Sequence, residues 1–515
     1  MRILYIDIDT LRPDHLGCYG YHRNTSPNID AIAGDAVRFD NCYVSDAPCL
    51  PSRSSTWSGR VGYHTGVVGH GGTAADPFIE GLGRGFVSTY SHTSWISLLR
   101  NAGLWTASVS PFAERHSAWW WYGGYREMYD PGKRGMESAH EVVPLALDWL
   151  KRNARRDNWF LHVNLWDPHT PYRAPMDFGN PFDNDPLPAW LTDEVRQRCW
   201  QGFGPHSAQE PHGYGNETIH KIYPRIPAQL DSMNAVKMWI DGYDAGIRYA
   251  DLHVGQLLNA LSDAGILDET VIMVSSDHGE NQGELNVWGD HQTADHITCR
   301  VPLIVRWPGL SSHVRSLGEF GTQTRIGAQE SAPYTGIAAR VDRALHYQVD
   351  WAATQLEMVG GKVPGNWDGQ SFAAAFRTGQ EQGRDYLVTS QGAWACQRGV
   401  RFDHDGEAYI CLNTYHDGYK MLEPVMLFNL TQDPHEQHDL AAERPDLAHH
   451  ALALLAEWQR GMMQTSTTDV DPLMTVMREG GPLHTRGCLR AYLQRLRDTG
   501  RAHHAERLAR LHPDE

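Results

Sequence analysis

Residues 3–9 read ILYIDID, and two later stretches, WFLHVNLWD (159–167) and TVIMVSSD (270–277), repeat their pattern. Each stretch is rich in Val, Ile, Leu or aromatic residues and ends in an aspartate, which is typical of a strand buried on both faces. Helix-like segments lie between the three stretches. They therefore predict an α/β fold, with a large mixed, mainly parallel sheet flanked by helices.

The clearest helix-like segment runs from residue 241 to residue 264, and Gly265 fits its stop. Its apolar residues recur at helical spacing: Ile247, Ala250, Val254, Leu257, Leu258 and Leu261. In sheets of this kind, ligands bind beyond the carboxyl ends of the strands. We therefore expect the aspartates that end the three strands, Asp9, Asp167 and Asp277, to lie where chemistry occurs.

The chain has 515 residues, which exceeds what one hydrophobic core normally supports. We predict a catalytic α/β domain over 1–384, a smaller antiparallel sheet with a helix (about 444–460) over 385–475, and a charged helical tail over 476–515. The tail could serve homo-oligomer assembly or only solvation. The segment 170–230 is rich in Pro, Gly, Asn and His and is predicted to be a functional insertion or a lid, and 310–340 also looks irregular.

Composition restricts the classes of function. Charged residues make up 21% and hydrophobic residues 41%, as in globular proteins, and the formal charge of −17 argues against nonspecific nucleic-acid binding. No apolar run reaches the roughly 20 residues that span a bilayer, and the N-terminus lacks a signal-peptide pattern. The eight cysteines are scattered without C-x-x-C pairs. These features predict a cytoplasmic location with no membrane partner.

Cys49 stands out because it lies between two prolines in APCLPSR (47–53). A disulfide partner, a metal ligand, a buried apolar thiol and a catalytic nucleophile are all compatible with a single cysteine in such a stretch. The other motifs of the chain decide among these roles.

Six motifs in order resemble the sulfatase family of the alkaline phosphatase superfamily. They are IDTLRPDHLGCYG (8–20), CLPSR (49–53), DPHTPY (167–172), SSDHGE (275–280), VPLIVRWPG (301–309) and LFNLTQDPHEQHDLA (427–441). The resemblance implies that Cys49 is oxidised to formylglycine, whose hydrated aldehyde is the nucleophile. It also implies that a formylglycine-generating enzyme reads the motif as a maturation partner, and that Arg53 holds the diol and neighbouring charge.

The same resemblance implies a divalent metal bound by Asp9, Asp277 and His278. Hard cations prefer oxygen ligands, so Ca²⁺ is the first expectation. His278 stands where many sulfatases have Asn, and imidazole leaves Mn²⁺ or Zn²⁺ open. Thr10 occupies the place of a frequent second aspartate. Asp7, on the same strand face as Asp9, either compensates as a ligand or is an ordinary hydrogen-bonded strand residue.

Histidines and arginines are expected around the sulfate. His169 matches a family histidine that assists departure of the alcohol, a role that needs a pKa near the working pH. The family's lysine-and-histidine segment is replaced here by SVSPFAERHSAWWWYGG (108–124), where Arg115 and His116 are the nearest candidates. No lysine follows SSDHGE, and His291 is the candidate there. The WWWY run (119–122) fits either sugar stacking or packing.

We therefore predict a sulfatase that hydrolyses an organic sulfate monoester to alcohol and sulfate, with the Trp-rich composition favouring a carbohydrate sulfate. One alternative is a phosphonate monoester or phosphodiester hydrolase of the same superfamily, which shares the formylglycine and the Asp/His metal pattern. Another is a non-catalytic binder of sulfated glycans. The intact motif around Cys49 argues against the binder.

Overall fold

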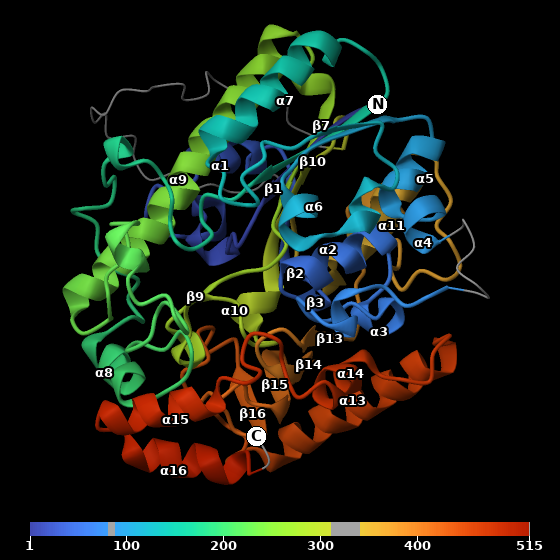
Figure 1. Ribbon diagram of the computed structural model, residues 1–515. Coiled ribbons are helices and arrows are strands. Elements are labelled where there is room, and N and C mark those ends of the chain that lie inside the picture. Colours follow the sequence, from blue (N-terminus) through green and yellow to red (C-terminus); the bar gives the residue numbers. More distant parts are fainter. Residues whose placement is uncertain (81–87, 311–339, 514–515) are drawn as a thin grey trace.

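The computed structural model describes residues 1–80, 88–310 and 340–513 (Figure 1). Its largest sheet has nine strands in the order β11-β2-β10-β7-β1-β6-β4-β5, with β12 also paired to β2. The strands are β1 (Arg2–Ile8), β2 (Val37–Tyr43), β4 (Trp105–Val109), β5 (Glu127–Tyr129), β6 (Trp159–Leu165), β7 (Thr270–Ser275), β10 (Arg300–Arg306), β11 (Arg340–Asp342) and β12 (His346–Tyr347). The predicted mixed, mainly parallel sheet is confirmed, because only β10 runs antiparallel to its neighbours β7 and β2.

The three strands predicted from sequence are neighbours at the centre of this sheet. β1 pairs in parallel with β6 on one side and β7 on the other, so their carboxyl ends meet at one edge. Alternate residues of β1 enter two separate cores: Leu4 and Ile6 pack into one, and Ile3 and Tyr5 into the other. A strand buried on both faces reads as a continuous apolar run, which is why the sequence pattern is clear.

Helices cover both faces of the sheet (Figure 1). One core contains side chains of α1 (Pro27–Ala33), α7 (Ala139–Asn153) and α9 (Met233–Asp263), and the other contains side chains of α2 (Cys49–Ser58), α5 (Trp95–Asn101) and α11 (Gln348–Met358). Shorter helices are α3 (Gly62–Thr65), α4 (Thr89–His92), α6 (Phe112–His116), α10 (His296–Cys299) and α12 (Ala373–Thr378). The helix expected from residue 241 begins earlier, where the Ser232 side chain accepts a hydrogen bond from the Ala235 amide.

A second, five-stranded sheet follows in the order β16-β15-β14-β13-β3. Its antiparallel part consists of β13 (Tyr386–Gln391), β14 (Cys396–His404), β15 (Glu407–His416) and β16 (Val425–Asn429), as the sequence predicts. The predicted helix is α13 (Pro445–Thr465), which packs on this sheet. The fifth strand, β3 (Asp46–Ala47), comes from the segment just before Cys49 and pairs in parallel with β13.

The remaining chain lies around these two sheets. The segment 170–230 is mostly irregular and contains α8 (Asp193–Gln201), and the tail forms α14 (Pro472–Arg478), α15 (Leu489–Asp498) and α16 (Ala502–Leu511). The last two helices share a small core with Phe203, so the tail packs against the irregular segment. β8 (Asn281–Gln282) and β9 (Trp288–Asp290) form a short hairpin after β7.

Two further sequence predictions concern the irregular stretch 310–340 and membrane-spanning helices. The irregular stretch 310–340 lies mostly outside the described residues. Among the helices that the structure describes, none combines the length and the apolar character that a bilayer crossing needs.

Candidate active site

Two aspartates lie side by side where β1 and β7 end. Asp9 follows β1, with its amide donating to the Leu165 carbonyl oxygen at 2.8 Å. Asp277 follows β7, and its Oδ1 accepts a hydrogen bond from the Thr10 amide at 3.3 Å. Both side chains are buried. The parallel register of the two strands therefore brings together carboxylates that lie 268 residues apart in the sequence (277 − 9).

Cys49 is the first residue of α2 and points into this carboxylate pair. Its side chain is buried, and Sγ lies 3.0 Å from His278 Nε2. The amino end of a helix favours negative charge, since its first amides lack intrahelical acceptors. Burial, together with the charges of Asp9 and Asp277, raises the pKa of the Cys49 thiol well above its usual value. In this form the residue is a neutral thiol.

The predicted metal ligands are brought together. Ligand atoms of Asp9, Asp277, His278 and Cys49 all lie within 4.8 Å of one another. His278 donates from Nδ1 to the Gly279 carbonyl oxygen at 2.8 Å, which leaves the Nε2 lone pair directed toward the site. Asp9 Oδ1 is buried and has no hydrogen-bond donor within the described residues. Two carboxylates and one neutral imidazole, with an oxygen left free, fit a divalent cation.

Arg53 lies one turn along α2 from Cys49 and neutralises three buried aspartates. Its Nη1 donates to Asp9 Oδ2 at 3.1 Å and also to Asp277 Oδ2, and its Nε and Nη2 donate to Asp7 Oδ2 at 3.0 and 2.9 Å. His162 Nε2 lies 3.3 Å from the same Asp7 oxygen. Asp7 is thus an ion-paired strand residue, in line with the second of its two sequence interpretations.

His169 and His291 also lie close to Cys49. Ligand atoms of these three residues form a second group within 4.8 Å. His169 donates from Nδ1 to the Thr170 carbonyl oxygen at 2.5 Å, so its Nε2 is the free nitrogen. The rings of His278 and His291 are 4.1 Å apart. Burial, together with Arg115, His291 and Arg173, lowers the pKa of His169 well below its usual value. Burial, together with His278, lowers the pKa of His291 to about 3.

Arg115 and His116 belong to α6 and line the same region less directly. The Arg115 guanidinium lies 5.0 Å from the centre of the Trp166 ring, which Arg53 also approaches at 5.5 Å. Arg115 Nε and His116 Nε2 are buried and have no partner among the residues described. Neither residue belongs to the two groups around Cys49, but both have donors available for an anion.

A ring of side chains that sequence reasoning missed continues from His116. His70 lies next to His116, with ring centres 5.1 Å apart, and its Nδ1 lies 3.0 Å from His484 Nε2. His484 stacks on Trp394 at 4.6 Å, and Trp394 contacts His206 edge-on at 5.2 Å. His206 Nε2 lies 3.0 Å from Asp290 Oδ2, beside His291. No spacing in the sequence signals this ring, because its members come from separate segments.

Other sequence candidates have structural contacts. Asp167, the third strand-terminal aspartate, accepts a hydrogen bond from the Ala139 amide at the start of α7 and belongs to neither group of ligand atoms around Cys49. In the WWWY run, Trp121 stacks on Trp57 at 4.2 Å and is buried, so packing explains it better than sugar stacking. Trp119 and Tyr122 of the same run are exposed.

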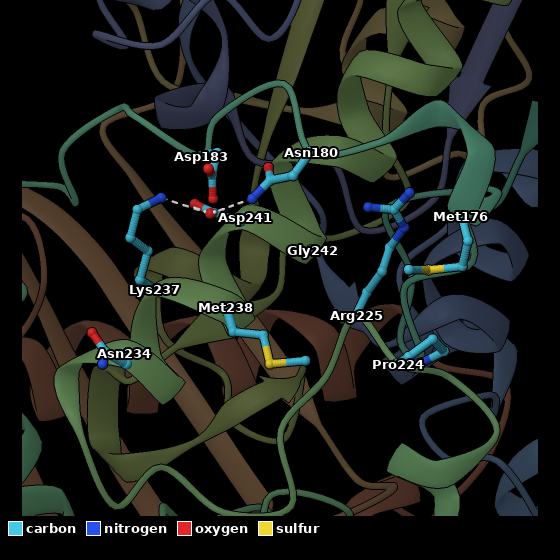
Figure 2. A pocket seen from close by; sticks show the side chains of 10 residues that line it. All are labelled: Met176, Asn180, Asp183, Pro224, Arg225, Asn234, Lys237, Met238, Asp241 and Gly242. Carbon is cyan, nitrogen blue, oxygen red and sulfur yellow. Dashed lines mark hydrogen bonds and ion pairs between the residues drawn. The ribbon is translucent and has the colours of Figure 1, made fainter.

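A separate cavity of about 320 Å³ lies beside the start of α9 (Figure 2). Its wall includes Asp241, whose carboxylate is held by Lys237 at 2.6 Å and by Asn180 at 2.8 Å. Met176 and Met238 form its exposed apolar part. None of the residues that line it is among the candidate site residues.

Comparisons with solved structures show a shared fold. A solved enzyme in complex with its substrate D-glucosamine-2-N,6-O-disulfate has a TM-score of 0.66 at 18% identity, covering 92% of this chain and 99% of the other. A phosphonate monoester hydrolase from Silicibacter pomeroyi has a TM-score of 0.61 at 19% identity, covering 92% and 97%. Both likenesses concern the fold, which this chain shares with the two proteins over nearly its whole length.

The particular family follows from the sequence. The family model described as Sulfatase matches residues 2–361, more than half of the chain. An N-acetylglucosamine-6-O-sulfatase from Bacteroides thetaiotaomicron is 22% identical over 93% of this chain and 89% of its own length. The chain belongs to the sulfatase family, and the protein is a sulfuric ester hydrolase.

Proposed function

We propose that the protein hydrolyses a sulfate monoester of a carbohydrate, with a formylglycine derived from Cys49 and a divalent cation bound by Asp9, Asp277 and His278. The observation that supports this best is the position of Cys49. Its sulfur lies at the start of a helix, close to both the carboxylate group and the His169–His291 pair. A nucleophile there would face both the cation and a proton donor.

The proposed groups supply chemistry that the unmodified side chains lack. A hydrated aldehyde at residue 49 offers one hydroxyl to attack sulfur and a second that expels sulfate and restores the aldehyde. A cation between Asp9, Asp277 and His278 supplies positive charge for the sulfate oxygens. Ca²⁺ is our first proposal, and the imidazole of His278 keeps Mn²⁺ and Zn²⁺ as alternatives.

The protein's own residues bind and orient the ester. Arg53 fixes the three aspartates, and the free Nε donor of Arg115 is available to a sulfate oxygen. His169 holds its Nδ1 proton on the Thr170 carbonyl, so Nε2 is the nitrogen that protonates the departing alcohol oxygen. His116 and His291 are the remaining donors beside the sulfate.

The ring of His70, His206, Asp290, Trp394 and His484 supports a carbohydrate as the alcohol. An ionised carboxylate and imidazoles can bond sugar hydroxyls, and an aromatic face suits sugar CH groups. His206 and His291 lower the pKa of Asp290 to about 2, so Asp290 is an acceptor at neutral pH. The similar sulfatase and the similar substrate complex both concern glucosamine derivatives, which also supports an amino-sugar sulfate.

The first test combines mass spectrometry with an assay. Protein produced together with a formylglycine-generating enzyme should show, at residue 49, the mass loss that accompanies replacement of CH₂SH by CHO. The same sample should release sulfate from glucosamine 6-sulfate and from an aryl sulfate, and Cys49→Ala should abolish both activities. An unmodified thiol in material that still hydrolyses esters would contradict the proposal.

A second assay tests whether the ring of protein side chains that includes His484 contacts the sugar. His484→Ala should raise KM for glucosamine 6-sulfate and leave an aryl sulfate unchanged, since only the sugar reaches the ring. The matched control is His450→Ala, on α13, which packs on the second sheet and lies outside the ring. Equal loss on both substrates would assign His484 to folding instead of substrate contact.

Phosphonate monoester or phosphodiester hydrolysis is the second candidate. The Asp277–His278 pair favours it, because imidazole suits Mn²⁺ or Zn²⁺, and so does the fold likeness to a phosphonate monoester hydrolase. Comparing kcat/KM for a phenyl phosphonate ester with that for glucosamine 6-sulfate separates the two. A higher value for the phosphonate would favour this candidate.

The cellular setting is also a proposal. We propose a cytoplasmic protein, supported by cysteines that are all free in the structure, and maturation by a formylglycine-generating enzyme. Within one chain, the tail helices pack against the irregular segment. Homo-oligomer assembly through these helices stays a prediction, which light scattering would test.

A further inference from the structure

We infer that the chain with an unmodified Cys49 has a zinc site formed by Cys49, His169 and His291. This site concerns the thiol form, so it does not depend on conversion to formylglycine. It differs from the proposed catalytic cation site, whose ligands are Asp9, Asp277 and His278.

The geometry of the three residues supports such a site. Their ligand atoms lie within 4.8 Å of one another, and the three side chains are 1%, 8% and 5% exposed. Cys49 begins α2, His169 follows β6, and His291 follows β9. Ligands fixed by three separate elements of a packed fold lose little conformational entropy on binding a metal.

Each of the two imidazoles has a ring nitrogen that is available to bind a metal. His169 commits its Nδ1 proton to the Thr170 carbonyl oxygen, which leaves the Nε2 lone pair free. His291 Nδ1 is buried and lacks a hydrogen-bond partner in the part of the chain that the structure describes. Neutral imidazole, with one nitrogen lone pair available, is the form that binds metals.

The donor set selects the metal. One thiolate and two imidazoles suit Zn²⁺, which leaves a fourth, open position in a tetrahedral site. Binding breaks the S–H bond of Cys49 and releases its proton to solvent, while the two neutral imidazoles release none. Each zinc ion therefore displaces one proton.

The consequence is a difference in metal preference between the two forms of the protein. Conversion of Cys49 to an aldehyde removes the sulfur ligand, and with it the preference for zinc over a hard cation. In the thiol form, zinc would occupy the space beside His169 where the ester must enter. Folded, unconverted protein would thus be held in a metal-blocked state.

Cobalt titration tests this inference, because Co²⁺ reports thiolate ligation by absorption. The full-length protein, made without a maturation enzyme and shown by mass to retain the thiol, should bind one Co²⁺ with a thiolate-to-cobalt charge-transfer band. Co²⁺ binding should release one proton per ion, and Zn²⁺ should then displace the cobalt without further proton release. Cys49→Ser and Cys49→Ala should each abolish the band, and His169→Ala and His291→Ala should each weaken binding by at least about tenfold.

Matched variants control for accessible thiols and buried imidazoles. Cys488 is the one cysteine of the eight that is not buried, so Cys488→Ser should leave the band unchanged. His253 is as buried as His291 but bonds only within α9 in the described contacts, and His253→Ala should also retain it. Circular dichroism of each variant verifies the fold.

Two results would overturn the inference. One is the absence of any charge-transfer band in protein with an intact thiol. The other is a band that survives in His169→Ala and His291→Ala but disappears in Asp277→Asn, which would place the thiol in the carboxylate group. Neither result bears on sulfate release by the converted protein, so failure of the proposed function is measured separately.

Discussion

At the scale of single residues, Arg53 compensates the negative charge of three buried aspartates. It is the shared partner of Asp7, Asp9 and Asp277, and all four side chains are at most 2% exposed. Removing one partner of a buried ion pair leaves uncompensated charge. We predict that Arg53→Met lowers the free energy of unfolding by about 3–5 kcal/mol, measured by urea denaturation in the presence of a chelator.

The same experiment has an internal control. Arg152 pairs with Asp148 at 3.1 Å on the surface, and Arg152→Met should leave stability unchanged, because exposed pairs contribute little. Adding Ca²⁺ should recover part of the loss in Arg53→Met, since a bound cation replaces the missing positive charge. Equal stability of Arg53→Met and wild type would show that the aspartates are protonated without it.

His169 gives a prediction about pH. Burial, Arg115, His291 and Arg173 lower its pKa, so the imidazole is neutral in the free protein at neutral pH. A proton donor with a lowered pKa loses activity as pH rises through that pKa, and a bound anion raises the pKa again. We expect the alkaline limb of kcat/KM below about pH 6.5, and that of kcat at higher pH.

Leaving-group dependence checks the same role. His169→Gln should remove this alkaline limb and slow sugar sulfates by about 10²–10⁴-fold, but slow aryl sulfates far less, because phenols depart without a proton. His253→Gln is the matched control and should leave both rates unchanged. Equal slowing of sugar and aryl sulfates would show that His169 does not act as the acid.

At the scale of secondary-structure elements, α9 positions the loop that contains His169. Gly246 lies against this loop, and a Cβ there would be 2.4 Å from the Asp167 carbonyl oxygen and 2.9 Å from Pro168 Cα. We predict that Gly246→Ala costs about 1–3 kcal/mol of stability and lowers kcat, because α9 and the loop must separate. Thermal unfolding and steady-state kinetics measure the two effects.

α13 provides the matched substitution. Gly461 is also inside a helix, but a Cβ added there would have open space within 4 Å. Gly461→Ala should therefore raise stability by up to about 1 kcal/mol, the ordinary difference in helix propensity, and leave kcat unchanged. If both glycines responded alike, propensity instead of packing would govern α9.

Sequence patterns predict the elements that are buried on both faces. The predicted β1, β6 and β7 agree with the structure within two residues, because continuous apolar runs mark such strands. The predicted start of α9 is wrong by eight residues (241 − 233), since its first turns are partly exposed and lack a strong apolar stripe. Motif resemblance likewise predicts residues that the fold brings around Cys49. The ring of His70, His206, Asp290, Trp394 and His484 is not predicted, because only tertiary contacts bring its members together.

At the scale of the whole molecule, the net charge of −17 opposes anionic substrates. Repulsion between the protein and a sulfated polymer acts over several ångströms and is screened by salt, whereas contacts inside the site are screened much less. We predict that kcat/KM for a highly sulfated polysaccharide rises between 20 and 200 mM salt, roughly the range over which the Debye length falls from about 20 to 7 Å.

A small monosulfated sugar is the control for this effect, because it has a single charge and should respond weakly. Steady-state kinetics at several concentrations of one salt measure both substrates. A fall in kcat/KM for the polymer would indicate a basic track on the surface that attracts it.

The pairing of β3 with β13 affects the order of events during synthesis. Ala47 pairs with Gln391, so the segment next to Cys49 can complete its sheet only after 344 further residues (391 − 47) have been made. At about 5–20 residues per second, a ribosome needs roughly 20–70 s to reach that point. During this interval the motif is an unfinished part of a nascent chain, open to an enzyme that acts on it. Once β13 has been made and β3 has paired with it, the folded protein leaves Cys49 only 1% exposed.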